Sequence, residues 1–216
     1  MRKFIFIAAA ACAAACLFTG CKKNVNYLDY ISEKRTDIYL YSDDGLEIKI
    51  YKSEKETPYS ADGIKGNMGK LCEIFVTLPK NAETVEISVG GINGEMSYRA
   101  VENCYYISAA DGGFDGESAS VTLVCDDKSA TYTAQSVLYD GVMNCEQAVK
   151  CVIDYNTELF KSMTTDKLFD GEIFVRLLYD EGCYYFVGVC DKNSKITAYL
   201  VDGERGKIIA QREING

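Results

Sequence analysis

The chain has no histidine and no tryptophan, and it contains only two prolines in 216 residues. Histidine is the usual general base near neutral pH and the commonest metal ligand in proteins. Its absence excludes a Ser-His-Asp or Cys-His catalytic site within this chain. A serine paired with lysine is the nucleophilic alternative, and the serines with a lysine within two residues include Ser32, Ser53 and Ser194. No glycine-rich motif leads from a strand into a helix, so we expect neither catalysis nor a cofactor.

Positive charge is outnumbered by negative charge. The chain carries 23 Lys and Arg against 32 Asp and Glu, which gives a formal net charge of −9. Binding to phosphate backbones needs a basic surface, so this balance argues against a nucleic-acid partner. The charges are interspersed along the sequence, and this pattern is typical of a solvated protein surface.

The longest apolar run lies at the N-terminus. Residues 1–3 begin with Met and two basic residues, residues 4–18 are apolar, and Thr19 and Gly20 stand before Cys21. About 15 apolar residues are fewer than the roughly 20 that a spanning helix needs. A basic start, a short apolar stretch and small residues at the end predict a secretory signal peptide over residues 1–20.

The segment Leu17-Phe18-Thr19-Gly20-Cys21 resembles the lipobox of bacterial lipoproteins, although Phe18 stands where that family usually has Leu. The resemblance covers residues 1–21. It implies that Cys21 is diacylated, that the chain is cut before it, and that the protein sits on the extracytoplasmic face of the cell membrane. Residues 21–36 are then expected to form a lipidated tether. Two acyl chains hold a protein on a membrane far better than one acyl chain does.

Seven further cysteines follow Cys21, namely Cys72, Cys104, Cys125, Cys145, Cys151, Cys183 and Cys190. An odd number cannot all pair internally. Cys145 and Cys151 are roughly 9 Å apart along a predicted helix, which is beyond disulfide reach. The pattern favours buried free thiols that act as small apolar side chains. The alternative is one or two long-range disulfides among Cys72, Cys104 and Cys125.

From Asp37 onward apolar residues alternate with polar ones. Strands are predicted at residues 38–41, 46–50, 72–78, 85–89, 95–101, 105–108, 120–125 and 130–134. Short strands with turn signals every 8 to 12 residues predict an antiparallel β-sandwich over residues 37–140, with an immunoglobulin-like layout.

The periodicity changes after Asp140-Gly141. Asn144 and Gln147 match a capping box, and apolar residues then recur at helical spacing to about residue 163. Strands are predicted at residues 173–179, 183–190, 196–201 and 207–214. We expect residues 141–216 to form a small α+β unit with one helix and an antiparallel four-strand meander, in a chain that is mainly β.

Two segments of this unit, Tyr184–Val189 and Tyr199–Ile209, resemble PepSY-type modules. Those modules pair strands around an Asp-x-x-x-Gly hairpin, here Asp202 and Gly206, after a helix. The match covers at most about 70 residues. It implies an exported module that restrains a peptidase.

An acidic loop is the best metal candidate in the sequence. Asp111, Asp115 and Gly116 match positions one, five and six of a calcium loop, and Glu117 follows them. Positions three and twelve do not match, so calcium is a weak hypothesis and we expect no resident metal. An ordinary surface loop is the simpler interpretation.

These observations predict a membrane-anchored lipoprotein that is a non-enzymatic binding module. Its expected partners are the membrane, through the lipid, and an extracytoplasmic protein. The long loop 57–70, with Tyr59, Asp62, Asn67 and Met68, has the length of a binding loop, and a plain surface connection is at least as good an interpretation. The alternative function, from the PepSY resemblance, is regulation of an exported peptidase or cell-wall enzyme.

Overall fold

The computed structural model describes residues 25–57 and 66–214. The predicted signal peptide, Cys21, Tyr59 and Asp62 lie outside the described residues. The strands of the N-terminal half are β1 (Ile31–Asp43), β2 (Leu46–Glu56), β3 (Met68–Thr77), β4 (Val85–Val89), β5 (Ile92–Glu95), β6 (Ser97–Arg99), β7 (Cys104–Ala109), β8 (Ser118–Cys125) and β9 (Lys128–Ser136). The C-terminal half contains α2 (Cys145–Tyr155), α3 (Thr157–Ser162), β10 (Thr164–Thr165), β11 (Leu168–Phe169), β12 (Gly171–Tyr179), β13 (Cys183–Asp191), β14 (Ile196–Asp202) and β15 (Ile208–Ile214).

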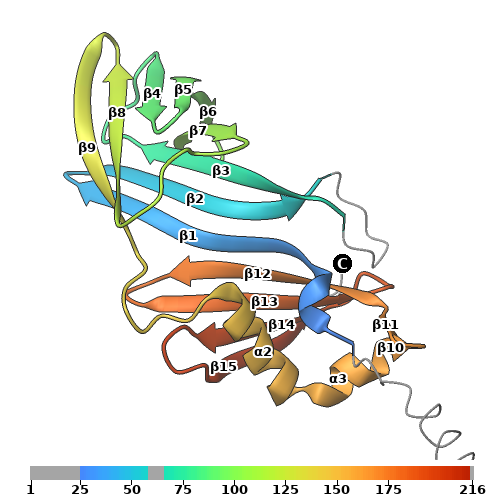
Figure 1. Ribbon diagram of the computed structural model, residues 1–216. Helices are drawn as coiled ribbons and strands as arrows, with labels where there is room; N and C mark the ends of the chain where they lie inside the picture. The colour runs from blue at the N-terminus through green and yellow to red at the C-terminus, as the bar shows by residue number, and fades with distance from the viewer. Residues whose placement is uncertain (1–24, 58–65, 215–216) are drawn as a thin grey trace, which may run out of the picture.

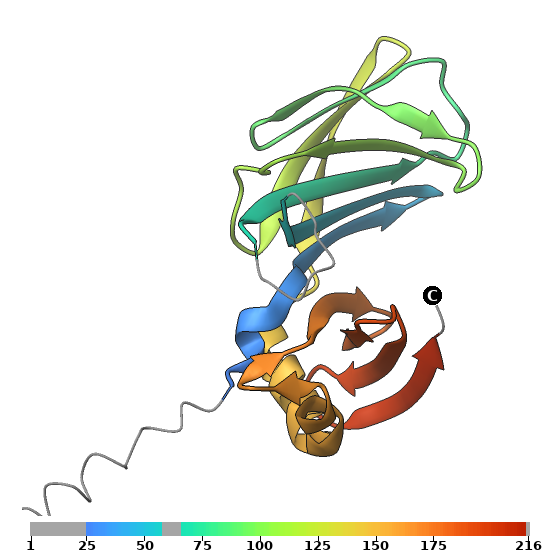
Figure 2. The same cartoon turned by 90° about the vertical axis from the view of Figure 1, so that its right-hand side faces the viewer.

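The fold is mainly antiparallel β, as expected, and one large sheet runs through both halves (Figure 1). Its strand order is β15-β14-β13-β12-β1-β2-β3-β7-β6, and a second arm, β9-β8-β4-β5, joins it through β1. The joint is the antiparallel pairing of Tyr39 and Leu40 in β1 with β9. The N-terminal strands therefore form one nearly barrel-shaped sheet (Figure 2). The immunoglobulin-like sandwich stays a prediction.

Alternation along the strands explains the core of this barrel. Leu46, Ile48 and Ile50 of β2 share one buried face, as their spacing predicts, while Glu47 and Lys49 between them are only half-buried. The same period places alternate residues of β3, β4 and β8 in the interior. Burying a residue of this type contributes about 1.5–3 kcal/mol, so the inward faces dominate the stability of the barrel.

The N-terminal segment differs from the expected tether. Residues 27–30 form a 3-10 helix, η1 (Tyr27–Tyr30), and β1 already begins at Ile31. The centroid of the Tyr27 ring lies 4.9 Å from that of Phe160 and 5.4 Å from that of Phe169, and all three rings pack in the core of the C-terminal half. Residues 31–35 also pair with β12 in parallel and contact β2 on their other side. Because this stretch is flanked by two strands and partly buried on both faces, it shows no clear period of two.

The C-terminal half is a helical hairpin packed on a meander. The capping box is confirmed, because Asn144 Oδ1 accepts from the Gln147 backbone N–H at 2.9 Å and Gln147 Oε1 accepts from the Asn144 N–H at 2.8 Å. The predicted continuous helix is wrong at Asn156, whose φ of −130° ends α2 and whose side chain caps α3. The strands β12 to β15 pair antiparallel in sequence order, as expected.

The apolar stripe of α2 lies against this meander, where Ala148, Val149 and Val152 are fully buried. Within the described residues, no helix combines the length and apolar character that a membrane crossing requires.

All seven cysteines of the described residues are free, which confirms the preferred prediction. Cys72, Cys104, Cys145 and Cys183 are buried and the other three are half-buried. Burial raises the pKa of the Cys145 thiol to about 12 and that of Cys72 to about 11. Both thiols therefore stay protonated near neutral pH and behave as small apolar groups.

Candidate functional site

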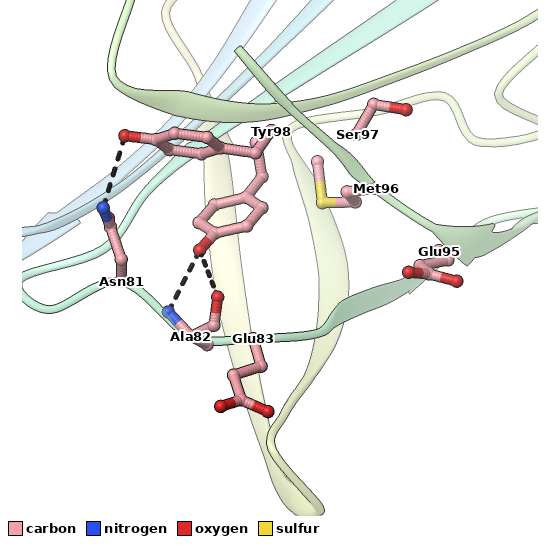
Figure 3. Close-up of a pocket in the computed structure, with 8 residues that line it drawn as sticks. Asn81, Ala82, Glu83, Glu95, Met96, Ser97 and Tyr98 are labelled. Atoms are coloured by element: carbon pink, nitrogen blue, oxygen red, sulfur yellow. Dashed lines mark hydrogen bonds between the residues drawn. The ribbon is translucent and has the colours of Figure 1, made fainter. Parts of the chain in front are cut away.

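Two adjoining open pockets lie where the segment 78–84 leads from β3 to β4. The first has a volume of about 630 Å³ and is lined by Asn81, Ala82, Glu83, Glu95, Met96, Ser97, Tyr98 and Tyr105 (Figure 3). The second has a volume of about 620 Å³, includes Tyr41 and Tyr132, and shares Asn81 and Ala82 with the first. We call the two pockets together the tyrosine end, defined by these four tyrosines and segment 78–84. Their volumes fall within the range of about 300–1,000 Å³ that is usual for ligand sites.

The Tyr98 side chain is exposed but held in place. It is 45% exposed, yet its hydroxyl donates to Asn103 Oδ1 at 2.7 Å. The same hydroxyl accepts from Asn81 Nδ2 at 3.2 Å (Figure 3). Its ring packs against the Tyr105 ring with centroids 5.1 Å apart. An aromatic ring braced in this way offers apolar contact area to a ligand and loses little freedom on binding.

Asn81 and Ala82, which line both pockets, form the wall between them. Hydrogen bonds fix this segment from both sides. The buried Tyr105 hydroxyl donates to the Ala82 carbonyl at 2.7 Å and accepts from the Ala82 N–H at 3.0 Å. Figure 3 shows Ala82 between Asn81 and Glu83 at this point. The Asp126 carboxylate accepts from the backbone N–H groups of Glu83 at 2.9 Å and Thr84 at 3.1 Å. The pockets are therefore preformed by side chains from β7 and from the β8–β9 turn.

Asp126 can reach this wall because of its turn geometry. Asp126 and Asp127 connect β8 to β9 with φ of 47° and 67°. Asp tolerates this left-handed region better than most residues, because its short side chain bonds to nearby backbone. A turn therefore separates the two strands predicted at residues 120–125 and 130–134, but it is shorter than expected because β9 already begins at Lys128. The turn also presents a carboxylate to the neighbouring segment.

The second pocket adds another aromatic pair and a mixed charge. The rings of Tyr41 and Tyr132 lie 5.0 Å apart. Asp43, Asp44 and Asp126 line this pocket together with Lys80 and Lys128. The first pocket has two carboxylates, Glu83 and Glu95, and no basic residue among the described residues that line it. The tyrosine end as a whole therefore combines aromatic faces with a surplus of carboxylates.

The acidic loop does not assemble a cation site. Asp115 pairs with Lys52 at 2.5 Å and Asp111 pairs with Lys70 at 3.3 Å. The hydrogen bond from Lys52 lowers the pKa of Asp115, and the Gly113 backbone N–H followed by Lys70 lowers that of Asp111. Each carboxylate therefore has its own lysine counter-charge, and the loop is clamped onto β2 and β3.

Glu117 contributes a backbone contact, since its carbonyl accepts from the Ser136 N–H at 2.8 Å. In the part of the chain that the structure describes, no three Cys, Asp or Glu side chains are placed to hold a metal ion.

The candidate serines and the described residues of the expected binding loop lie outside the tyrosine end. The Ser32 hydroxyl donates to the Ile173 carbonyl at 3.4 Å, Ser53 is buried, and Ser194 lies in a turn with φ of 63°. In the expected binding loop, the Asn67 carbonyl accepts from the Thr57 N–H at 2.8 Å, and Met68 is the first residue of β3.

A second aromatic cluster, formed by Tyr51, Phe75 and Tyr106, lies on the sheet face outside the barrel core. Arginine side chains cover its rings. Arg35 lies 4.1 Å from the Tyr51 ring centroid and Arg99 lies 3.4 Å from that of Tyr106. Arg176 binds Glu33 with both nitrogens of a fork, at 2.6 and 3.1 Å. The Arg176–Glu33 pair links β12 to β1 across the two halves, and the cation–π contacts link β1 to β2 and β6 to β7. No such cation covers Tyr98 among the described contacts, which makes the tyrosine end the better candidate for ligand binding.

Comparisons with known proteins give no likeness: no family model matches the chain, and neither a curated protein nor a solved structure is significantly similar to it. The candidate site therefore rests on the geometry of this chain alone. The sequence did not single out Asn81, Tyr98 or Tyr105, because they follow no common period: Asn81 lies in the β3–β4 connection, and Tyr98 and Tyr105 pair across β6 and β7. The abundance of tyrosine was the available signal.

Proposed function

We propose that this protein is a membrane-anchored extracytoplasmic lipoprotein that acts as a non-enzymatic binding module, and that it binds its partner at the tyrosine end. The observation that carries the proposal is the Tyr98 ring, which is exposed and fixed by two amides in an open, preformed pocket. Tyrosine supplies large contact area at low conformational cost and is favoured in binding surfaces for this reason.

The position of the tyrosine end suits an anchored binder. With the lipid on Cys21, only residues 22–24 separate it from the described chain, which enters at Val25 beside η1. The 13 residues of β1 then lead to the opposite side of the molecule (Figure 1). At about 3.3 Å per residue the strand spans roughly 40 Å. Tyr41, near its far end, would thus face away from the membrane surface, toward partners in the cell envelope.

The chemistry of the pockets also favours binding over catalysis. The chain lacks histidine, and the described residues that line the first pocket offer amide, hydroxyl and carboxylate groups. These groups form hydrogen bonds to a ligand and fix its orientation.

The regulatory alternative draws on the helix and meander that resemble a PepSY-type module. Its sequence hairpin is present as a turn, in which the Gly206 N–H donates to the Asp202 carbonyl at 3.0 Å. Ala148, Val149 and Val152 of α2 are fully buried against the meander, so these residues are not available for contact with a peptidase. A peptidase regulator therefore stays the second candidate.

The test compares what native cell envelopes retain. Acylated wild-type protein is immobilised beside Tyr98→Ala and Tyr179→Ala variants; Tyr179 is also 45% exposed but belongs to β12. We expect an envelope protein or glycan to be retained by the wild type and by Tyr179→Ala and to be lost from Tyr98→Ala. Equal retention by all three, or no retention, would contradict the proposal.

Lipid attachment is measured separately. Metabolic labelling with a fatty-acid analogue should label the wild-type protein and leave Cys21→Ser unlabelled. Absence of label on the wild-type protein would refute the anchor.

A further inference from the structure

The tyrosine end has the chemistry of a site for sugars, and this inference rests on the proposed binding function. We infer that the tyrosine end binds an extended, uncharged glycan chain. Three features of the two pockets lead to this ligand class: the fixed aromatic faces, the hydrogen-bonding groups around them, and the sign of the charge.

The aromatic faces fit the apolar side of a sugar ring. Tyr98 presents an exposed ring in the first pocket, and the Tyr41–Tyr132 pair lies in the second. A pyranose ring has a face of C–H groups that packs on an aromatic face with little desolvation of its hydroxyls, since those project from the ring edge. The brace on the Tyr98 hydroxyl from Asn81 and Asn103 keeps the ring oriented before a ligand arrives.

The groups beside the rings match hydroxyl ligands. Carboxylates accept hydrogen bonds and serine hydroxyls donate and accept them, so Glu83, Glu95 and Ser97 complement a row of sugar hydroxyls. Hydrogen bonds to charged acceptors are about twice as strong as neutral ones. A purely apolar ligand would desolvate these groups without replacing their hydrogen bonds, which is unfavourable.

The charge of the first pocket disfavours acidic ligands, and in the second pocket three carboxylates outnumber Lys80 and Lys128. Glu83 and Glu95 stand without a basic neighbour among the described residues that line the first pocket. A uronate or phosphate would face like charge there, and like charges in close contact are strongly unfavourable. An uncharged chain avoids this repulsion.

The arrangement of the pockets indicates a chain and not a single sugar. The two pockets, of about 630 and 620 Å³, adjoin at Asn81 and Ala82 and each holds an aromatic surface. A linear oligosaccharide that crosses the wall would contact both surfaces at once. Joining two contacts in one ligand raises its affinity above that of either contact alone.

Methionine methyl groups provide a direct measurement of occupancy. Met96 lines the first pocket, whereas Met143 lies beside the N-terminus of α2 and Met163 follows the last residue of α3. The mature acylated protein, labelled with ¹³C in its methionine methyls, is studied by NMR in micelles of a zwitterionic detergent without a sugar headgroup. The uncharged probes are the hexasaccharides of glucose in β-1,4 and α-1,4 linkage, of N-acetylglucosamine and of xylose. Hexagalacturonate and hexalysine are the charged probes.

We expect at least one uncharged hexasaccharide to shift the Met96 signal in a saturable way, while Met143 and Met163 stay unchanged. Tyr98→Ala should raise the Kd for that hexasaccharide at least tenfold. Tyr98→Phe should raise it less, because the ring remains, and Tyr179→Ala should leave it unchanged. Thermal unfolding of each variant verifies that it is folded.

A Met96 shift with hexalysine alone would assign the site to a cationic peptide, and one with hexagalacturonate alone would assign it to an acidic chain; either would overturn the glycan inference. If no uncharged probe shifts Met96 while envelopes still yield a partner that depends on Tyr98, the glycan inference fails and the binding function stands. If the envelopes also yield nothing, both fail.

Discussion

Replacing Tyr105 with Phe tests how the wall between the two pockets is held. The ring of Tyr105 is buried and would stay in place, so the change removes only the hydroxyl and its two hydrogen bonds to Ala82, at 2.7 and 3.0 Å. Each such bond contributes about 0.5–1.5 kcal/mol net. Ala82 is half-buried, so water replaces part of the loss. We expect Tyr105→Phe to lower the free energy of unfolding by about 1–2 kcal/mol.

Urea unfolding followed by far-ultraviolet circular dichroism measures this difference, and a chain of this size loses about 2–4 °C of Tm per kcal/mol. Tyr98→Phe is the matched control, because it also removes one hydroxyl from the tyrosine end but from a side chain that is 45% exposed. A surface change of this kind alters stability by less than about 0.5 kcal/mol. Equal stability of Tyr105→Phe and the wild type, or an equal loss in both variants, would refute the reasoning.

Two further predictions concern the C-terminal half. Burial raises the pKa of Cys145 from 9.0 to about 12, so its contribution to stability is present below pH 9 and is lost as the pH rises from there toward 12; at pH 10 the loss is about 1.4 kcal/mol. Urea unfolding at pH 8 and pH 10 should show this extra loss in the wild type and not in Cys145→Ala, and identical pH dependence would contradict it. Asn144→Ala removes the capping box of α2 and should lower the free energy of unfolding by about 1 kcal/mol. Asn156→Ala should lower it by at least as much, because it removes both the cap of α3 and the hydrogen bond to the buried Tyr199 hydroxyl; in urea unfolding, no loss for Asn144→Ala would show that its cap contributes little.

The local chemistry of the sequence predicted much of the fold. The strand at Val85–Val89 and the turn at Asp126-Asp127 are found where alternation and turn residues place them. The Asn144 cap forms as its spacing to Gln147 predicts. Each of these features depends on residues close together in the chain, so the sequence contains the information directly.

Features set by distant contacts were not predictable in this way. The start of β1 at Ile31 depends on its pairing with β12, more than 100 residues later. The break at Asn156 is accompanied by a hydrogen bond from its side chain to the Tyr199 hydroxyl at 2.8 Å. The candidate site has the same origin, because Asn81 lies in the β3–β4 connection and Tyr98 lies in β6, and the two meet only when β7 pairs with both β3 and β6.

The retention of envelope material by Tyr98→Ala, relative to Tyr179→Ala, tests the central claim most directly. The two variants remove rings of equal exposure from opposite halves of the chain. The account predicts that the partner bound by the wild type is lost only when the Tyr98 ring is removed. A partner held equally well by both variants would show that the tyrosine end is not the binding site.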